Sequence, residues 1–236
     1  MNDSINIIID GKIINAKPGQ TIVEAALENG IYIPTLCHLK GAIPAGTCRI
    51  CNVKINGRFM TACTTEVRKD MVIENDTEEI NELRKIIIET LFVSGNHYCP
   101  ACEKSGNCML QALGYKYWIM IPRFDYQFEN KEIDALSPKL ILERNRCILC
   151  RKCIRTIQNK EGENYFAIEN RGHNSRIIID HNLAVNMTDK EADMAMENCP
   201  VGSLLKKEVG FSQAIGSRKY DKVPIDELEQ LKVDND

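Results

Sequence analysis

The sequence predicts an α+β fold built from three consecutive modules. Two hairpin signals and one helix signal occur in the first part of the chain, an amphipathic helix follows, and short strand-like segments return later. We therefore divide the 236-residue chain into modules at 1–75, 76–125 and 126–210, followed by a polar tail at 211–236. At 44% apolar residues, the chain has enough hydrophobic side chains to form buried cores.

A predicted hairpin and a short helix open the first module. Strand-like segments at 5–9 and 12–16 flank Asp10-Gly11, a dipeptide that accepts the positive φ angles of a tight turn. A capping box marks the start of the helix that follows, and a glycine marks its end. These two signals are Thr21 with Glu24, and Asn29-Gly30.

A second hairpin completes this module. The segments Arg49–Ile55 and Arg58–Cys63 are joined by Asn56-Gly57, and Met71–Ile73 has the composition of a further short strand. Two strand pairs around one helix predict a compact α+β domain over residues 1–75.

The second module begins with an amphipathic helix. Asp76 and Glu79 form a second capping box, and apolar residues recur at helical spacing until Gly95. We interpret this apolar stripe as a face that packs on the core. Another short helix is predicted for Met109–Leu113, and Gly114 is expected to end it.

The third module contains cysteine-bearing segments separated by short strands. Tyr165–Ile168 and Arg176–Ile179 have strand-like composition. The tail at 211–236 is polar and charged, with one proline. We expect the tail to be a solvated extension rather than a strap over a partner.

Composition argues against several classes of protein. The first ten residues have no basic segment and no small-residue cleavage site, and no apolar run approaches bilayer-spanning length. The net charge of -3, with Lys and Arg spread along the chain, provides no basic face for nucleic acid. We therefore expect a cytoplasmic protein, in which cysteines stay reduced and clustered cysteines bind metal.

Four of the 11 cysteines lie in the first module, with the spacing C-x10-C-x2-C-x11-C. A loop that contains Gly41 and Gly46 can curl so that several thiolates face one cluster, which favours a [2Fe-2S] site. The alternative is that these cysteines are small buried apolar residues. The four residues are Cys37, Cys48, Cys51 and Cys63.

Three cysteines of the second module follow the pattern C-x2-C-x5-C, with His97 two residues upstream. Three thiolates and an imidazole can hold a [4Fe-4S] cluster, and they can equally form a structural zinc site. The residues alone leave both sites open. With a zinc site, the chain would be a zinc-stabilised interaction protein. The cysteines are Cys99, Cys102 and Cys108.

The third module carries the most specific pattern, C-x2-C-x2-C with a distant Cys-Pro. In this run three close thiolates and one remote thiolate hold a single [4Fe-4S] cluster. A two-cluster ferredoxin would have four more cysteines, at positions that hold other residues here, so one cluster is expected. The predicted ligands are Cys147, Cys150, Cys153 and Cys199, and the four other positions hold Ile157, Asp189, Ala192 and Ala195.

These three groups account for all 11 cysteines, so no thiol remains for a catalytic nucleophile. His38 follows a predicted ligand and is expected to be a loop residue, with a hydrogen bond near the first cluster as the alternative. His173 and His181 lie in polar stretches and are predicted to be surface residues. The chain has no G-x-G-x-x-G or P-loop motif for a nucleotide cofactor.

The three cysteine motifs, in this order, resemble the amino-terminal iron-sulfur module of the large respiratory complex I subunit. They read CHLKGAIPAGTCRICNVKINGRFMTAC, NHYCPACEKSGNCMLQ and RCILCRKCIR, with a later NCPVGSL. A similar module opens [FeFe]-hydrogenases and certain formate dehydrogenases. In length, the chain is similar to the small diaphorase subunit of soluble NAD-reducing [NiFe]-hydrogenases, and the resemblance covers about residues 5–210.

The resemblance implies a fold and a set of ligands. It implies a β-grasp first domain like plant ferredoxins, a small helical domain whose [4Fe-4S] cluster has one histidine and three cysteine ligands, and a bacterial-ferredoxin-like third domain. His97 is then the fourth ligand of the middle cluster. In the complex I pattern three residues separate the histidine from the first cysteine, whereas only Tyr98 separates them here.

The resemblance also implies a function. The chain would be a non-catalytic electron relay within an NAD(P)-linked oxidoreductase complex, and therefore part of a hetero-oligomer. A flavin- and NAD(P)H-binding diaphorase subunit would exchange electrons with the [2Fe-2S] domain. The [4Fe-4S] sites would serve a hydrogenase, a formate dehydrogenase or an electron-bifurcating flavoprotein complex. A self-sufficient reductase that binds its own flavin is the remaining alternative.

Overall fold

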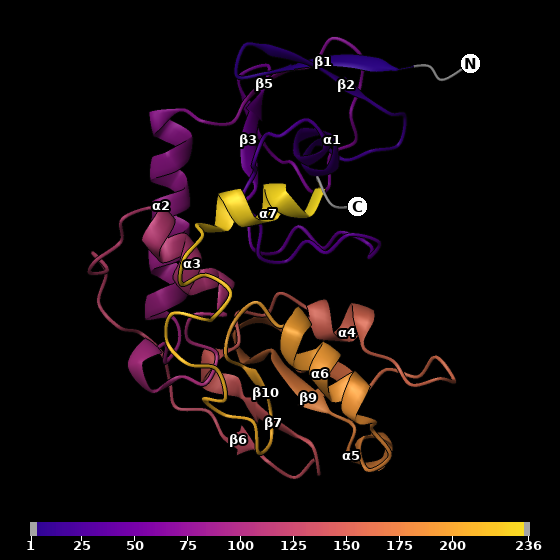
Figure 1. The fold of residues 1–236 in the computed structure, drawn as a ribbon, viewed down its shortest axis with the longest axis vertical. Helices are drawn as coiled ribbons and strands as arrows, with labels where there is room; N and C mark the ends of the chain where they lie inside the picture. The colour runs from indigo at the N-terminus through magenta and orange to yellow at the C-terminus, as the bar shows by residue number, and fades with distance from the viewer. Residues whose placement is uncertain (1–3, 234–236) are drawn as a thin grey trace.

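The computed structural model describes residues 4–233 and has sheets at its two ends with helices between them (Figure 1). Helices α2 (Glu78–Val93) and α7 (Ile225–Val233) occupy the intervening region. Residues 1–3 of the predicted first module and 234–236 of the tail lie outside the described residues. In the described part of the chain, no helix has both the length and the apolar character needed to cross a bilayer.

The first module forms a five-stranded sheet in the order β2-β1-β5-β3-β4. Strand β1 pairs in parallel with β5, and the other neighbouring strands are antiparallel. The buried face of α1 (Ile22–Glu28) joins the strands in one apolar core. The strands are β1 (Ile5–Ile9), β2 (Lys12–Ala16), β3 (Asn52–Ile55), β4 (Arg58–Thr61) and β5 (Val72–Glu74).

Both predicted turns and the first capping box are confirmed. The φ angles are 49° and 78° at Asp10-Gly11, and 48° and 79° at Asn56-Gly57. The Thr21 hydroxyl accepts from the Glu24 amide at 3.4 Å, while the Glu24 carboxylate accepts from the Thr21 amide at 2.8 Å. These local signals were correct because each depends only on residues that are close in sequence.

Helix α2 begins one residue later than the second capping box predicted. Thr77 is the N-cap, because its backbone is extended and its hydroxyl accepts from the Ile80 amide at 3.3 Å. The Asp76 carboxylate accepts a 2.6 Å hydrogen bond from the Asn81 side chain instead. Asp and Thr are both favourable N-caps, so their adjacency made the sequence ambiguous.

Helix α3 (Met109–Lys116) continues through Gly114, so the prediction that this glycine ends the helix was wrong. A β-carbon at Gly114 would stand 3.2 Å from the Phe92 ring of α2. The glycine therefore allows the two helices to pack closely. The left-handed residue that follows α3 is Trp118, whose φ is 54°.

The third module contains the sheet β10-β7-β6, a separate hairpin of β8 and β9, and short helices. The predicted strand Arg176–Ile179 is confirmed, and the strand before it lies one residue later than predicted. The elements are β6 (Ile133–Asp134), β7 (Leu140–Glu143), α4 (Lys152–Thr156), β8 (Phe166–Glu169), β9 (Arg176–Ile179), α5 (His181–Ala184), α6 (Asp189–Asn198) and β10 (Leu204–Lys206), with 3-10 turns at Arg144–Arg146 and Gly172–Asn174. A further 3-10 turn, Cys99–Ala101, lies in the second module.

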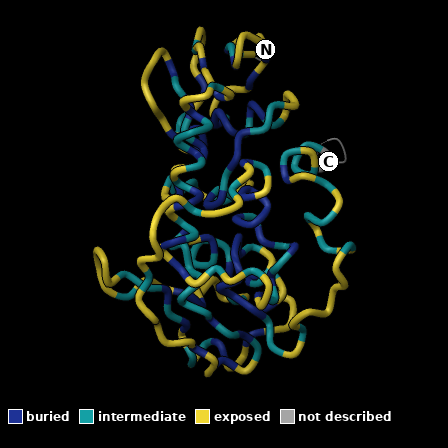
Figure 2. The backbone as a smooth tube through the Cα atoms, turned by 90° about the vertical axis from the view of Figure 1, so that its left-hand side faces the viewer, coloured by how far each residue is buried: buried dark blue, intermediate teal, exposed yellow. Residues whose placement is uncertain are grey.

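One apolar core joins the second and third modules and reaches into the first. It contains Leu36 and Ile50 from the first module, Leu110 from α3, and Phe166 and Leu204 from the third module. Buried segments accordingly run through the centre of the molecule (Figure 2). The three modules therefore share a core and are not independently packed domains.

Arg84 of α2 attaches this helix to the first sheet. The side chain is only 2% exposed, and its guanidinium donates to the backbone carbonyls of Ile50, Asn52 and Asn75 at 3.3, 3.1 and 3.0 Å. It also donates to the Asn75 side-chain oxygen at 2.7 Å. These bonds hold α2 against the loop before β3, the start of β3 and the residue that follows β5.

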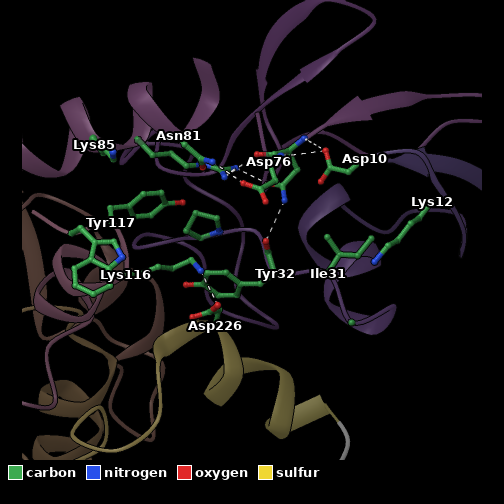
Figure 3. Close-up of a pocket in the computed structure, with 15 residues that line it drawn as sticks. Asp10, Lys12, Ile31, Tyr32, Asp76, Asn81, Lys85, Lys116, Tyr117 and Asp226 are labelled. Atoms are coloured by element: carbon green, nitrogen blue, oxygen red, sulfur yellow. Dashed lines mark hydrogen bonds and ion pairs between the residues drawn. The ribbon is translucent and has the colours of Figure 1, made fainter. Parts of the chain in front are cut away.

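The tail packs on the protein, which corrects the expectation of a solvated extension. Ile225 is 1% exposed, and Asp226 forms a 2.7 Å ion pair with Lys116 of α3 (Figure 3). The Gln230 side chain donates to the Gly30 carbonyl at 3.0 Å. The tail has few apolar residues, but the fold brings them to a junction of the first and second modules.

Candidate metal centres

The four cysteines of the first group come together in the structure. Cys37 and Cys48 lie in the long loop between α1 and β3, Cys51 immediately precedes β3, and Cys63 follows β4. All four residues are buried. The predicted loop glycines have the required backbone, because Gly41 and Gly46 adopt φ angles of 80° and 62°.

Hydrogen bonds between thiols connect the sulfur atoms of this group. The thiols of Cys48 and Cys63 donate to Cys37 and hold the pKa of Cys37 well below its usual range. The Cys63 thiol also lowers the pKa of Cys51, and its own pKa is raised because Cys37 and Cys51 accept its hydrogen bonds. Four buried sulfur atoms linked by hydrogen bonds fit a metal cluster, whose iron atoms would take the place of the thiol protons on binding.

The third group lines a cavity with all four of its predicted ligands. Cys147 and Cys150 lie in one loop, where Leu149 and Arg151 have positive φ angles, Cys153 lies in the first turn of α4, and Cys199 caps the end of α6. Burial raises the pKa of Cys147 to about 11 and that of Cys150 to about 12. Four thiols that line one cavity, on the same kind of run as in ferredoxins, match the ligand set of a [4Fe-4S] cluster.

Three of the four positions that a second ferredoxin cluster would need are part of the packed core, whereas Asp189 is exposed. Ile157, Ala192 and Ala195 are each 0% exposed, and the two alanines lie on the buried side of α6. Apolar side chains thus occupy three of the positions where a second set of thiolates would be needed.

The middle group surrounds the start of α3. Cys99 begins a 3-10 turn, Cys102 follows it, and Cys108 is the N-cap of α3, where its sulfur accepts from the Gln111 amide at 3.4 Å. Burial raises the pKa of all three thiols, and that of Cys108 reaches about 12. The bound form of this site would again require the loss of these protons.

The His97 side chain is half-buried beside this group. Burial, with a smaller effect of Arg146, lowers the pKa of His97 to about 4, so the imidazole is neutral at pH 7. A neutral imidazole has the nitrogen lone pair that a metal ligand needs. The ring packs edge-on against Phe92 with centroids 5.8 Å apart, and the Cys99 thiol donates to the His97 backbone carbonyl at 3.5 Å.

Within residues 4–233, no three Cys, His or carboxylate side chains converge on the position of a single metal ion. A cluster needs a wider arrangement than one ion, since its protein ligands bind different iron atoms. Whether these cysteines can hold clusters is therefore tested by the sulfur contacts of the first group and by the cavity that the third group lines.

The third group lies between the other two groups. The Pro200 carbonyl, next to Cys199, accepts from the Met109 amide at 2.8 Å and from the Cys108 thiol at 3.6 Å. A β-carbon at Gly202 would stand 2.5 Å from the Cys102 sulfur. The segment after Cys199 is thus in direct contact with the middle group.

Two buried lysines, which the sequence analysis did not single out, lie at the junctions between groups. Burial lowers the pKa of Lys152, while nearby Cys150, Cys199, Cys37 and Cys48 act in the opposite direction. Lys104 is buried in the same way near Cys199, Cys108 and Cys102. Their positions inside the cysteine motifs were the only sequence signal that could have drawn attention to them.

The remaining histidines differ in exposure. His173 is exposed, as predicted. His181 is only partly exposed, and its Nε2 lies 3.2 Å from the buried Asp134 carboxylate, so its prediction as a surface residue was incomplete. His38 lies in the loop as expected, and among the described residues its Nδ1 is buried without a hydrogen-bond partner.

Three family models match successive parts of the chain. Residues 2–78 match a 2Fe-2S iron-sulfur cluster binding domain, and residues 84–123 match the NADH-ubiquinone oxidoreductase-G iron-sulfur binding region. Residues 137–205 match the ferredoxin-like domain of NADH-quinone oxidoreductase subunit 3. These matches give no support to the zinc-stabilised alternative.

Relatives match nearly the whole chain. The NAD-reducing hydrogenase HoxS subunit gamma of Cupriavidus necator is 48% identical over 92% of this chain and 94% of its own length. The NADPH-Fe(3+) oxidoreductase subunit alpha of Geobacter sulfurreducens is 34% identical over 88% of this chain, which corresponds to 24% of that protein.

A solved structure agrees with these sequence matches. A chain of the crystal structure of NAD+-reducing [NiFe]-hydrogenase in the H2-reduced state superposes with a TM-score of 0.86 and 37% identity, covering 95% of this chain and 98% of that one. The protein therefore belongs to the same iron-sulfur family as the NAD-reducing hydrogenase HoxS subunit gamma.

Proposed function

We propose that the chain is a non-catalytic electron-relay subunit of an NAD(P)-linked oxidoreductase complex, with one [2Fe-2S] and two [4Fe-4S] clusters. The β-grasp type assigned to its first domain is supported by a five-stranded sheet with one packed helix. The proposed ligands are Cys37, Cys48, Cys51 and Cys63 for the [2Fe-2S] cluster, His97, Cys99, Cys102 and Cys108 for the middle cluster, and Cys147, Cys150, Cys153 and Cys199 for the third.

The observation that carries this proposal is the arrangement of the three cysteine groups. Each group is mostly buried, and the third contacts the middle group through the Pro200 carbonyl and lies near the first group at Lys152. Such clusters, when bound, accept and release single electrons at potentials set by ligand type, burial and hydrogen bonds. The chain's contribution is to hold the sites close together and shield them from water.

The proposed partners follow from the family. A relative of nearly the same length is named as a subunit of an NAD-reducing hydrogenase, which favours a hydrogenase module and a flavin- and NAD(P)H-binding diaphorase subunit as partners. We accordingly expect the chain to be part of a hetero-oligomer in the cytoplasm. Formate dehydrogenase or an electron-bifurcating flavoprotein complex remains the alternative partner, which co-purification of the native complex would identify.

Metal analysis of the full chain, purified anaerobically, tests the relay. We expect about ten irons per chain with matching labile sulfide, because one [2Fe-2S] and two [4Fe-4S] clusters require that number. Stoichiometric zinc without labile sulfide would exclude the proposal. Bound flavin together with NADH-dependent dye reduction by the isolated chain would favour a self-sufficient reductase instead.

A further inference from the structure

Arg155 contacts two cysteine loops that are more than 100 residues apart in sequence. It belongs to α4, directly after the third group's C-x2-C-x2-C run. One nitrogen of its guanidinium, Nη2, donates to the backbone carbonyl of Cys37 at 2.6 Å and to that of Cys150 at 3.3 Å. These carbonyls belong to predicted ligands of two different clusters.

The rest of the guanidinium secures the same junction. Nη1 donates to the Ile43 carbonyl, six residues beyond Cys37 in the first group's loop. Nε donates to the Arg151 carbonyl at 3.1 Å, at the left-handed residue that follows Cys150. A single side chain thus has two acceptors in each loop.

The chemistry of the side chain matches this geometry. Guanidinium is planar, carries donors in a fixed fork and stays charged throughout the pH range of proteins. Its four acceptors here are neutral carbonyls, so these hydrogen bonds do not neutralise its charge. A positive charge near a redox site favours the state with the extra electron.

We propose that Arg155 is a positioning residue that locks the first group's loop against the third group's loop and places one positive charge beside both sites. The inference rests on the proposed function, since it assumes that both sites hold clusters. Arg155 then fixes the relative position of the first-group and third-group clusters and raises the reduction potential of each.

Lysine would not replace Arg155 fully. An ammonium group keeps the charge, but it lacks the rigid fork that reaches carbonyls in two loops at once. The two contributions of Arg155, charge and geometry, are therefore separable by substitution.

The experiment compares Arg155→Gln and Arg155→Lys with Arg171→Gln in the cluster-loaded full chain. Arg171 is exposed in the same module, so its substitution removes an equal charge away from the junction. Potentiometric titration followed by EPR measures each cluster's potential. Spin coupling between the two reduced clusters reports their mutual position.

We expect Arg155→Gln to disfavour the reduced state of both clusters by about tenfold, which for one electron is about 59 mV. Arg155→Lys should restore most of this shift and still alter the spin coupling, whereas Arg171→Gln should change neither. The proposal is overturned if Arg155→Gln matches Arg171→Gln in potential and coupling. If Arg155→Gln fails to retain clusters, wild-type coupling in Arg155→Lys would overturn it.

Failure of the proposed function gives a different result. In that case the wild-type chain itself lacks labile sulfide and the two EPR signals, before any variant is considered. If the wild-type clusters are intact and the Arg155 variants behave like wild type, only the proposed role of Arg155 is rejected.

Discussion

Gly202 lies directly against Cys102, because a β-carbon at position 202 would stand 2.5 Å from the Cys102 sulfur. Such an approach is shorter than any normal contact of a β-carbon. The glycine is therefore required where the third module's chain passes the middle cysteine group.

Gly202→Ala should displace Cys102 and damage the middle cluster. We expect the loss of about four irons per chain and of that cluster's EPR signal, while the other two signals remain. Gly210→Ala is the matched control, since its β-carbon would meet only the flexible Glu103 side chain at 3.2 Å. Equal iron content in both variants would contradict the requirement for glycine at 202.

His97→Ala should change only the middle cluster. If the neutral imidazole is the fourth ligand, its removal alters or abolishes one low-temperature EPR signal and leaves the [2Fe-2S] and third-group signals intact. His173→Ala is the control, because that histidine is exposed. An unchanged spectrum for His97→Ala would mean that another group completes the site.

Arg84→Met should loosen the attachment of α2 to the first sheet. The substitution leaves the buried carbonyls of Ile50, Asn52 and Asn75 without their donor, and we expect a loss of about 2 kcal/mol or more. Thermal unfolding of the cluster-loaded chain measures the effect. Lys85→Met, at the next position of the same helix, removes an equal charge and should lower the midpoint much less.

Ile225→Ala should release the tail from the protein. Truncating a buried isoleucine costs about 2 to 5 kcal/mol, and the ion pair of Asp226 with Lys116 alone cannot offset that. Limited proteolysis should then cleave the segment before α7 faster than in wild type. Glu227→Ala, on the exposed side of the helix, serves as the control, and identical cleavage rates would show that Ile225 does not anchor the tail.

Local signals predicted much of the fold. The hairpin turns at Asp10-Gly11 and Asn56-Gly57 depend on backbone angles that glycine, asparagine and aspartate accept, so short sequences were sufficient to identify them. Helix α6 was missed, although Thr188 and Glu191 form a capping box at its start. Gly114 was misread because a glycine that permits close helix packing looks the same in sequence as one that ends a helix.

The sequence by itself was enough to predict which thiols belong together, because most cluster ligands follow characteristic short spacings and the remote Cys199-Pro200 completes the ferredoxin-type run. Only the tertiary structure decided how those groups relate to one another. It placed the third group between the other two, set Gly202 against Cys102, and brought Arg155 to the carbonyls of Cys37 and Cys150. These contacts join residues far apart in the chain through the packing of a shared core, which no local spacing encodes.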